Sequence, residues 1–367
     1  MTSPDPIPPK LSAALNAAPS ADTPLKHGGD LGAARVLFPN APEPIVDLST
    51  GVNPHPYPIA DTTLEDFAHL PEPAALARLT QLAAAFYGAP SSDNVVAAPG
   101  SQILVALIAD LTPQGRSRIL GPTYAEHARV AALAGHEVAT VGTLAELCGA
   151  SLAVVVNPNN PDGRVTARDD LLSLASRQNA QGGLLVVDEA FMEVGPQGES
   201  VTGSVDGAPI VVLRSFGKFF GLGGMRLSFA VASRDLARQL RARLGPWPIS
   251  GPALRIGAAA FADRRWIDSA RTGLKGASER LKALLGAAGL ELIGQTDLFC
   301  LVSSTHAQEI FEGLGEEGIC VRRFDENQQL LRFGLPGMEM EWQRLKNARV
   351  ARSSRGNDRV ETLVGPA

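Results

Sequence analysis

The sequence predicts an α/β protein in which a mostly parallel sheet of about seven strands lies between layers of helices, followed by a smaller α+β domain. Two observations carry this prediction. From about residue 90 to residue 235, short continuous runs of Val, Ile and Leu alternate with segments of helical periodicity. Continuous apolar runs are typical of strands that are buried on both faces. After Arg243 the pattern changes at a Gly- and Pro-rich segment, 245–252, which indicates a second domain.

The elements of the large sheet follow from this alternation. Strands are predicted at Val95–Ala98, Arg118–Gly121, Glu137–Val141, Leu152–Asn157, Leu184–Asp188, Ile210–Arg214 and Leu227–Ala232. Helices are predicted between them over 74–87, 101–111, 124–134 and 167–180. Helical crossovers of this kind are what joins neighbouring parallel strands.

The remainder of the chain predicts the smaller domain and two tails. Two helices are expected up to about Ala288, and further helices near 306–315 and 339–350. Strands are expected at Leu298–Ser303, Ile319–Arg322 and Leu330–Gly334. The predicted division of the chain is a flexible tail (1–26), an N-terminal arm (27–60), a large domain (61–243), a small domain (244–350) and a flexible tail (351–367).

Composition excludes several classes of function. The 33 Lys and Arg residues are outnumbered by 38 Asp and Glu, so we expect no nucleic-acid or membrane partner. No apolar run approaches the roughly 18 residues of a membrane span. The three cysteines stand far apart and the six histidines lack metal-ligand spacing, so neither a disulfide framework nor a metal site is expected. The N-terminus lacks the pattern of a secretory signal, and we expect a cytoplasmic protein.

Polar segments follow the carboxyl ends of four predicted strands, the edge at which open α/β sheets bind ligands. Gly100-Ser101-Gln102 opens a helix, whose N–H groups suit a phosphate; an ordinary capped turn is the alternative. In the segment NPNNPDG (157–163), prolines stiffen a loop that would aim the Asn157 amide into the crevice, with a plain turn as the alternative.

The other two segments carry an acid and an amine. Asp188 ends the strand LLVVD, where a buried carboxylate requires a cation or a donor; a helix-capping or salt-bridged Asp is the alternative. Lys218 stands among Phe and Gly residues, where desolvation disfavours the ammonium form and makes the amine a better nucleophile. A surface lysine in a flexible loop is the alternative, and the flanking aromatic residues argue against it.

These groups together fit pyridoxal 5′-phosphate. Lys218 would form a Schiff base with the aldehyde, and Asp188 would keep the pyridine nitrogen protonated. Asn157 would donate to the phenolic oxygen, and Tyr124 would lie on the ring face. We therefore expect Lys218, Asp188 and Tyr124 to be catalytic. The residues expected at the cofactor phosphate are Gly100, Ser101, Gln102, Ser215 and Arg226.

The same segments resemble the fold-type I pyridoxal-phosphate enzymes, in the branch of histidinol-phosphate aminotransferase and threonine-phosphate decarboxylase. The resemblance runs from about His27 to about Val350. It rests on PGSQ (99–102), PTYAEH (122–127), NPNNPDG (157–163), VVDEAF (186–191), SFGKFFGLGGMRLSFA (215–230) and LLRFGLPG (330–337). It implies the fold-type I architecture, a homodimer with active sites at the subunit interface, and Arg332 as the partner of the substrate carboxylate.

Two N-terminal segments narrow the resemblance. LKHGGDLGAA (25–34) and IVDLSTGVNPHPYP (45–58) are similar to threonine-phosphate decarboxylases of cobalamin biosynthesis. This implies decarboxylation of the small phosphorylated amino acid O-phospho-L-threonine to (R)-1-amino-2-propanol phosphate. The residues that it implies at the substrate are His27, Gly28, Gly29, Asn53, Asn157, Arg322 and Arg332.

Three departures separate the chain from the aminotransferases of this family. Phe191 stands where they usually have Tyr, Gly217 where a phosphate-binding hydroxyl often lies, and Leu70-Pro71 where a Tyr-Pro pair reaches the neighbouring subunit's phosphate. Tyr57 is a candidate substitute for that tyrosine. The alternatives left open are an aminotransferase of the histidinol-phosphate type and a non-catalytic pyridoxal-phosphate-binding protein.

Overall fold

The computed structural model describes residues 27–59, 62–351 and 360–362, and these form two compact units. Unit 1 contains 57–160 and 164–268, and unit 2 contains the described residues before Tyr57, the short segment 161–163 and the chain from Ser269 onward. The predicted tails, 1–26 and 351–367, lie outside the described residues except for Ala351 and Val360–Thr362.

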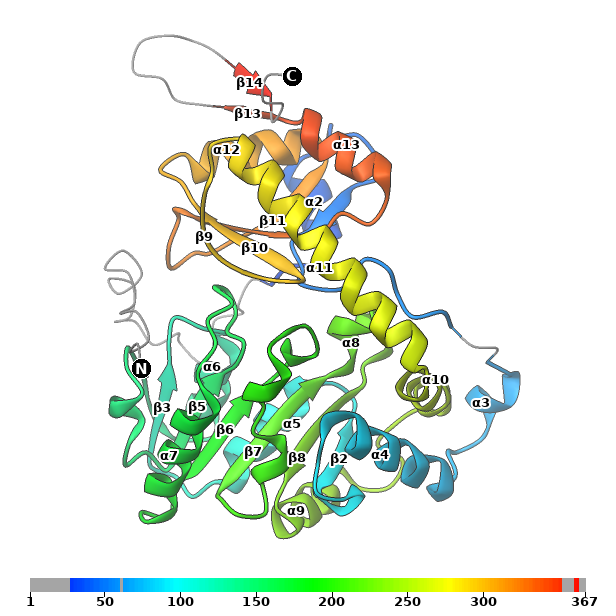
Figure 1. Ribbon diagram of the computed structural model, residues 1–367, viewed down its shortest axis with the longest axis vertical. Helices are drawn as coiled ribbons and strands as arrows, with labels where there is room; N and C mark the ends of the chain where they lie inside the picture. The colour runs from blue at the N-terminus through cyan, green and yellow to red at the C-terminus, as the bar shows by residue number, and fades with distance from the viewer. Residues whose placement is uncertain (1–26, 60–61, 352–359, 363–367) are drawn as a thin grey trace. The chain divides into compact units, whose positions relative to one another are not determined.

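Unit 1 is built on a seven-stranded sheet with the order β2-β8-β7-β6-β5-β3-β4 (Figure 1). The strands are β2 (Val95–Ala98), β3 (Arg116–Leu120), β4 (Glu137–Val141), β5 (Leu152–Val156), β6 (Leu184–Asp188), β7 (Ile210–Ser215) and β8 (Ser228–Ala232). β8 runs antiparallel to both of its neighbours, β2 and β7, and the other neighbouring strands of this sheet are parallel. The predicted fold class, with a mostly parallel seven-stranded sheet, is confirmed.

Helices cover both faces of this sheet. They are α3 (Leu64–Ala68), α4 (Pro73–Tyr87), α5 (Ser101–Leu111), α6 (Glu126–Leu133), α7 (Arg168–Asn179), α8 (Phe216–Phe219), α9 (Arg234–Leu244) and α10 (Gly251–Ala262). Figure 1 draws α7 in front of the sheet and α5 behind it. Val186 and Val187 point to opposite faces and are 3% and 0% exposed, which explains why the sequence of β6 is continuously apolar.

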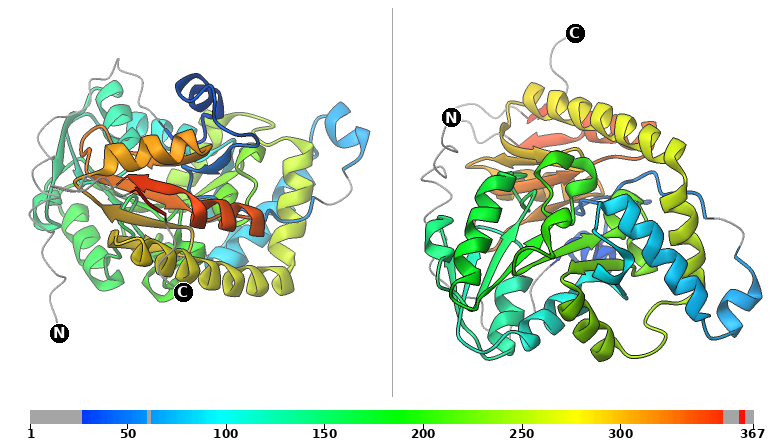
Figure 2. Two further views of the ribbon diagram at one scale, coloured as in Figure 1. Left: turned by 90° about the horizontal axis from the view of Figure 1, so that it is seen from above. Right: turned by 60° about the horizontal axis from the view of Figure 1, so that its bottom comes forward.

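Unit 2 contains a five-stranded sheet with the order β1-β11-β12-β10-β9. Its strands are β1 (Val46–Leu48), β9 (Glu291–Thr296), β10 (Phe299–Ser303), β11 (Ile319–Arg323) and β12 (Leu330–Gly334). The helices are α2 (Leu31–Leu37), α12 (Ala307–Glu316), α13 (Glu339–Asn347) and most of α11 (Arg264–Ala287). In Figure 2, left, α12 and α11 lie on opposite sides of the sheet. A short pair, β13 (Arg349–Ala351) and β14 (Val360–Thr362), follows.

The units divide at other places than the predicted domains. The sequence analysis placed the boundary at residues 243 and 244, whereas unit 1 extends to Asp268. The reason is that α10 packs on α4: a Cβ added at Gly257 would come within 2.9 Å of both Leu79 and Leu227. The predicted arm, 27–60, is divided as well. Its residues before Tyr57 belong to unit 2, because β1 pairs in parallel with β11, and Tyr57 begins a segment of unit 1. No helix within the described ranges is long and apolar enough to cross a membrane.

Candidate active site

The carboxyl ends of β5, β6 and β7 bring three predicted residues together in unit 1. Asn157 follows β5 directly, Asp188 ends β6 and Ser215 ends β7. The Asn157 N–H donates to the Asp188 carbonyl over 2.8 Å. All three strands are mostly or wholly buried, so their ends are rigid supports. Chain order reverses beside β5, since β3 and β4 lie beyond it, and ligands of open α/β sheets bind at such a reversal.

The Asp188 carboxylate is held by two contacts. Its Oδ2 lies 2.9 Å from His127 Nε2, and its Oδ1 accepts from the Ala190 N–H over 3.1 Å. Both Asp188 and His127 are buried, and the His127 ring meets the edge of the Tyr124 ring at 5.9 Å. The sequence analysis expected no metal site at the histidines and assigned no role to His127. Its position three residues after Tyr124, behind the end of β3, was the available signal.

Gly100 and Arg226 form a cradle at the N-terminus of α5. Gly100 has φ of 101°, and a Cβ there would lie 2.4 Å from Arg226 Nη2. Arg226 itself adopts a left-handed conformation, with φ of 54°, and donates from Nη1 to the Gly223 carbonyl. The guanidinium thus lies against the first turn of α5, where Ser101 and Gln102 carry backbone N–H groups without helical acceptors. Cation and helix terminus together suit an anion.

Lys218 lies on the short helix α8, directly after β7. It is half-buried, and its Nζ is 5.8 Å from the centre of the Phe191 ring. Gly217 precedes it, and a Cβ at Gly217 would lie 2.8 Å from Gly223 Cα. The close approach of these two backbones explains the glycine at this position.

Tyr124 lies in the electrostatic field of this site. Burial raises its pKa to about 12, with smaller upward contributions from Glu126 and Asp188 and a downward one from Arg226. The phenol therefore remains neutral at ordinary pH and can donate a hydrogen bond.

The side chain of Gln102 points away from the cradle of Gly100 and Arg226. Its amide donates to Glu126 Oε2, so the contribution of Gln102 to the cradle is its backbone N–H.

Asn157 is fully buried and its amide is paired with the backbone of Thr166. Its Nδ2 donates to the Thr166 carbonyl over 3.1 Å, and its Oδ1 accepts from the Thr166 N–H over 2.9 Å. Asn159 in the same loop accepts from Thr123 Oγ1 over 2.6 Å. The two bonds to Thr166 fix the plane of the Asn157 amide at the end of β5.

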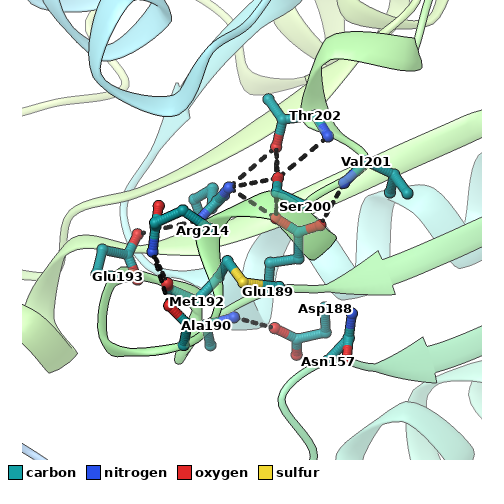
Figure 3. A network of polar contacts seen from close by, with 12 residues as sticks. Asn157, Asp188, Glu189, Ala190, Met192, Glu193, Ser200, Val201, Thr202 and Arg214 are labelled. Carbon is teal, nitrogen blue, oxygen red and sulfur yellow. Dashed lines mark hydrogen bonds and ion pairs between the residues drawn. The ribbon is translucent and has the colours of Figure 1, made fainter. Parts of the chain in front are cut away.

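A buried ionic network lies directly behind the ends of β6 and β7 (Figure 3). Arg214 Nη2 is 2.7 Å from Glu189 Oε2, and Arg214 Nη1 is 3.6 Å from Glu193 Oε1. The exposed fractions of Arg214, Glu189 and Glu193 are 2%, 0% and 2%. Ser200 Oγ and Thr202 Oγ1 accept from Arg214 over 2.8 and 3.1 Å.

This network adjoins two of the predicted site residues. Glu189 follows Asp188 in the chain, and Arg214 precedes Ser215. Because successive side chains of a strand point to opposite faces, the ion pair braces the strand ends from the side opposite Asp188 and Ser215. Sequence reasoning missed it, although charged residues that end buried apolar strands were a visible signal.

The predicted substrate residues apart from Asn157 belong to unit 2. His27, Gly28 and Gly29 precede α2, and the Gly29 N–H donates to Ser49 Oγ over 2.8 Å. Asn53 is buried, and its Oδ1 accepts from the His55 N–H over 2.8 Å.

Arg322 and Arg332 stand opposite each other in the antiparallel pair β11–β12. Arg332 is 7% exposed, lies 5.0 Å from the centre of the Phe299 ring, and donates to the Ser49 carbonyl over 3.0 Å. Burial and the neighbouring Arg322 lower the pKa of Arg332 to about 10, while Asp47 acts in the opposite direction. Like charges directly opposite each other are destabilising unless an anion lies between them, so this pair is a candidate anion site.

Tyr57 does not occupy the position that the sequence analysis considered for it. Its side chain is 8% exposed and packs within unit 1, 5.1 Å from the Trp266 ring centre. Burial raises its pKa, and Asp263 raises it further through a hydrogen bond. Tyr57 therefore belongs to the apolar core of unit 1 and is not available to reach another subunit.

Comparison with known proteins identifies the family of this chain. Residues 43–344 match the family model of class I and II aminotransferases. A threonine-phosphate decarboxylase of Sinorhizobium sp is 41% identical over 85% of this chain and 93% of its own length. That of Pseudomonas aeruginosa is 37% identical over 88% of this chain and 97% of its own length. Histidinol-phosphate aminotransferases are more distant, with 28% identity for that of Pasteurella multocida over 75% of this chain and 83% of its own length.

Solved structures share the fold. Histidinol-phosphate aminotransferase of Sinorhizobium meliloti, solved in complex with pyridoxal-5′-phosphate, superposes with a TM-score of 0.76 at 19% identity, covering 88% of this chain and 93% of that one. L-threonine-O-3-phosphate decarboxylase of Porphyromonas gingivalis gives 0.67 at 22% identity, covering 82% and 97%. The family match spans most of the chain and confirms the family resemblance, and the chain belongs to the class I and II aminotransferase family.

Proposed function

We propose that this chain is a pyridoxal-phosphate-dependent decarboxylase that converts O-phospho-L-threonine to (R)-1-amino-2-propanol phosphate. The observation that carries the choice of substrate is the facing pair Arg322 and Arg332, which favours a substrate with strongly anionic groups. The two relatives that share 41% and 37% identity over most of their lengths carry the name of this enzyme. The product is the aminopropanol phosphate linker of cobalamin, so we place the reaction in cobalamin biosynthesis.

The cradle at Gly100 in unit 1 independently supports pyridoxal phosphate as the cofactor. Gly100 leaves open a cradle that a Cβ would fill, lined by Arg226 and the first-turn N–H groups of α5, and this suits an ester phosphate. Ser215 ends β7 and would add a hydroxyl. Asp188 supplies a buried carboxylate, fixed by His127, for a protonated ring nitrogen.

The bound cofactor supplies an aldehyde that captures the substrate amine and a ring that accepts electrons from its Cα. Asp188 would keep the ring nitrogen of the cofactor protonated, and that positive charge would stabilise the electrons that Cα releases. Tyr124, which burial keeps as a neutral phenol, would lie on the face of the ring. The Nζ of Lys218 returns a proton to the substrate Cα after carbon dioxide leaves.

The substrate-binding residues decide which bond at Cα breaks, because they set the rotation of the substrate about its Cα–N bond. A decarboxylase must hold the carboxylate perpendicular to the ring, whereas an aminotransferase must hold the hydrogen there. We propose that Arg322, Arg332 and the segment His27–Gly29 grip the anionic groups of the substrate and so select decarboxylation.

Two assays on the purified holoenzyme test this function. O-phospho-L-threonine should yield carbon dioxide and aminopropanol phosphate, and the Lys218→Ala variant should lose both the turnover and the visible absorbance of the bound cofactor. The aminotransferase alternative predicts that histidinol phosphate and 2-oxoglutarate yield glutamate instead. Glutamate formation without carbon dioxide release would contradict the proposal, and cofactor absorbance without either reaction would favour a non-catalytic binding protein.

We further propose that the enzyme is a cytoplasmic homodimer. Phe67, Leu70 and Trp247 are 69%, 67% and 54% exposed and line a groove of about 460 Å³ in unit 1. Gly224 and Met225, which precede Arg226, line the same groove, so a second copy seated there would adjoin the phosphate cradle. The three cysteines are unpaired thiols, as a reducing compartment requires. Light scattering that gives a monomeric mass for the holoenzyme would contradict the dimer.

A further inference from the structure

Ser49 connects the N-terminal segment of unit 2 with its buried arginine. Its Oγ accepts from the Gly29 N–H over 2.8 Å, and its carbonyl accepts from Arg332 Nη2 over 3.0 Å. Ser49 is 8% exposed, so these bonds are largely shielded from water. One residue therefore positions a backbone donor and a guanidinium at the same time.

The backbone around Ser49 allows little freedom. The Asp47 carboxylate accepts from the Ser49 N–H over 2.9 Å and from the Ser49 hydroxyl over 2.5 Å, both at Oδ1. A Cβ added at Gly28 would lie 2.2 Å from the Ser49 carbonyl oxygen, so the segment packs directly on that carbonyl. Asp47 belongs to β1, which pairs with β11 in register, and the sheet thereby fixes the turn that presents Ser49.

The bonds at Ser49 link two groups of donors that we assign to the substrate. Gly29 is in a left-handed conformation, with φ of 91°, and its neighbours His27 and Gly28 share its segment. Arg332 faces Arg322 across the β11–β12 ladder. An anion held between such groups is bound best when the donors are oriented before it arrives.

We propose that Ser49 is a positioning residue that aligns the His27–Gly29 segment with Arg332 to form one anion-binding subsite. The inference rests on the proposed function, which assigns both groups of donors to a phosphorylated substrate. Ser49 does not contact the substrate in this proposal. It orients the donors, and the donors bind the anion.

The first test compares Ser49→Ala with Ser278→Ala in the holoenzyme. Ser278 is a buried serine of unit 2, 0% exposed, whose hydroxyl donates over 3.1 Å to the Thr296 carbonyl. Ser49→Ala removes the hydroxyl that accepts from the Gly29 N–H and donates to Asp47, and it keeps the carbonyl that accepts from Arg332. Inorganic phosphate binding, measured by calorimetry, should weaken about tenfold, as expected when the Gly29 N–H loses its buried acceptor. Ser278→Ala should leave phosphate binding unchanged. In turnover of O-phospho-L-threonine, Ser49→Ala should raise KM by a similar factor and change kcat little.

The second test is a double-mutant cycle with Gly29→Ala, which strains the left-handed backbone and displaces the Gly29 N–H from Ser49. Each single substitution should weaken phosphate binding about tenfold, and the pair should weaken it about tenfold rather than a hundredfold, because both break the same link. Additive effects, or equal effects of Ser49→Ala and Ser278→Ala, would overturn the inference. If phosphate binding follows the expected pattern but O-phospho-L-threonine releases no carbon dioxide, the proposed reaction fails and the assignment of Ser49 stands.

Discussion

Removing the Arg214 guanidinium should destabilise unit 1 strongly. Arg214→Met keeps an unbranched apolar chain of similar length but leaves the carboxylates of Glu189 and Glu193, which are 0% and 2% exposed, without their cation. Breaking a buried ion pair by deleting one partner costs about 3–5 kcal/mol, because the remaining charge stays buried. For a unit of this size, that corresponds to a fall of roughly 6–20 °C in melting temperature.

The assay is thermal unfolding of the holoenzyme at neutral pH, followed by circular dichroism and by the loss of visible cofactor absorbance. Arg280→Met is the matched control. Arg280 makes a two-pronged pair with Glu339, with both bonds at 2.7 Å, but the two side chains are 46% and 63% exposed. Solvent screens such a pair, so its loss should shift the melting temperature far less.

A second substitution separates the charge from the packing. In Arg214→Met, the further change Glu189→Gln removes one of the stranded charges and should restore part of the lost stability. The reasoning is refuted if Arg214→Met is as stable as Arg280→Met, or if Glu189→Gln lowers the stability of the Arg214→Met protein further.

Three further outcomes follow from the site. Gly100→Ala should raise the dissociation constant for pyridoxal phosphate at least about tenfold, because its Cβ would lie 2.4 Å from Arg226 Nη2. Gly182→Ala, at φ of 70° with open space around it, is the control for backbone strain alone. Equal affinities of the two variants for pyridoxal phosphate would contradict the cradle. His127→Phe should lower kcat about ten- to a hundredfold and change the pH dependence of the cofactor spectrum, since a hydrogen bond to the buried Asp188 carboxylate is lost. A spectrum that stays unchanged at every pH would contradict the role of His127 in holding Asp188. Because the pKa of Arg332 is lowered to about 10, its cation is present below that pH, and kcat/KM should fall as the pH rises through 10. A flat profile to pH 11 would contradict a lowered pKa at a substrate-binding arginine.

The sequence was sufficient to predict the strands of the large sheet. Strands β2, β4 and β6 begin and end at the predicted residues. β2 and β6 are apolar runs bounded by polar or glycine-rich segments, whereas β4 also contains Glu137 and Thr140. The strands β1 and β9 were missed. Both are short or interrupted by polar residues, as in Glu291–Thr296 with its central Gly294, and local periodicity cannot identify strands that depend on a distant partner.

The candidate site, too, was predicted from the sequence only in part. The order of chemical groups along the chain was enough to nominate Asp188, Lys218 and Arg226 and the cofactor that joins them. It gave no indication that His127 holds Asp188 or that Arg214 braces the strand ends, because these contacts join residues 61 and 25 positions apart in the chain.

What the sequence by itself determined is the set of groups and the class of fold, since composition, apolar runs and turn residues act over a few positions. What only the tertiary structure decided is which groups meet: the cradle of Gly100 and Arg226, the facing arginines of β11 and β12, and the turn at Ser49. The physical reason is that hydrogen bonds and ion pairs require approach to about 3 Å, and only sheet pairing and packing bring distant residues that close.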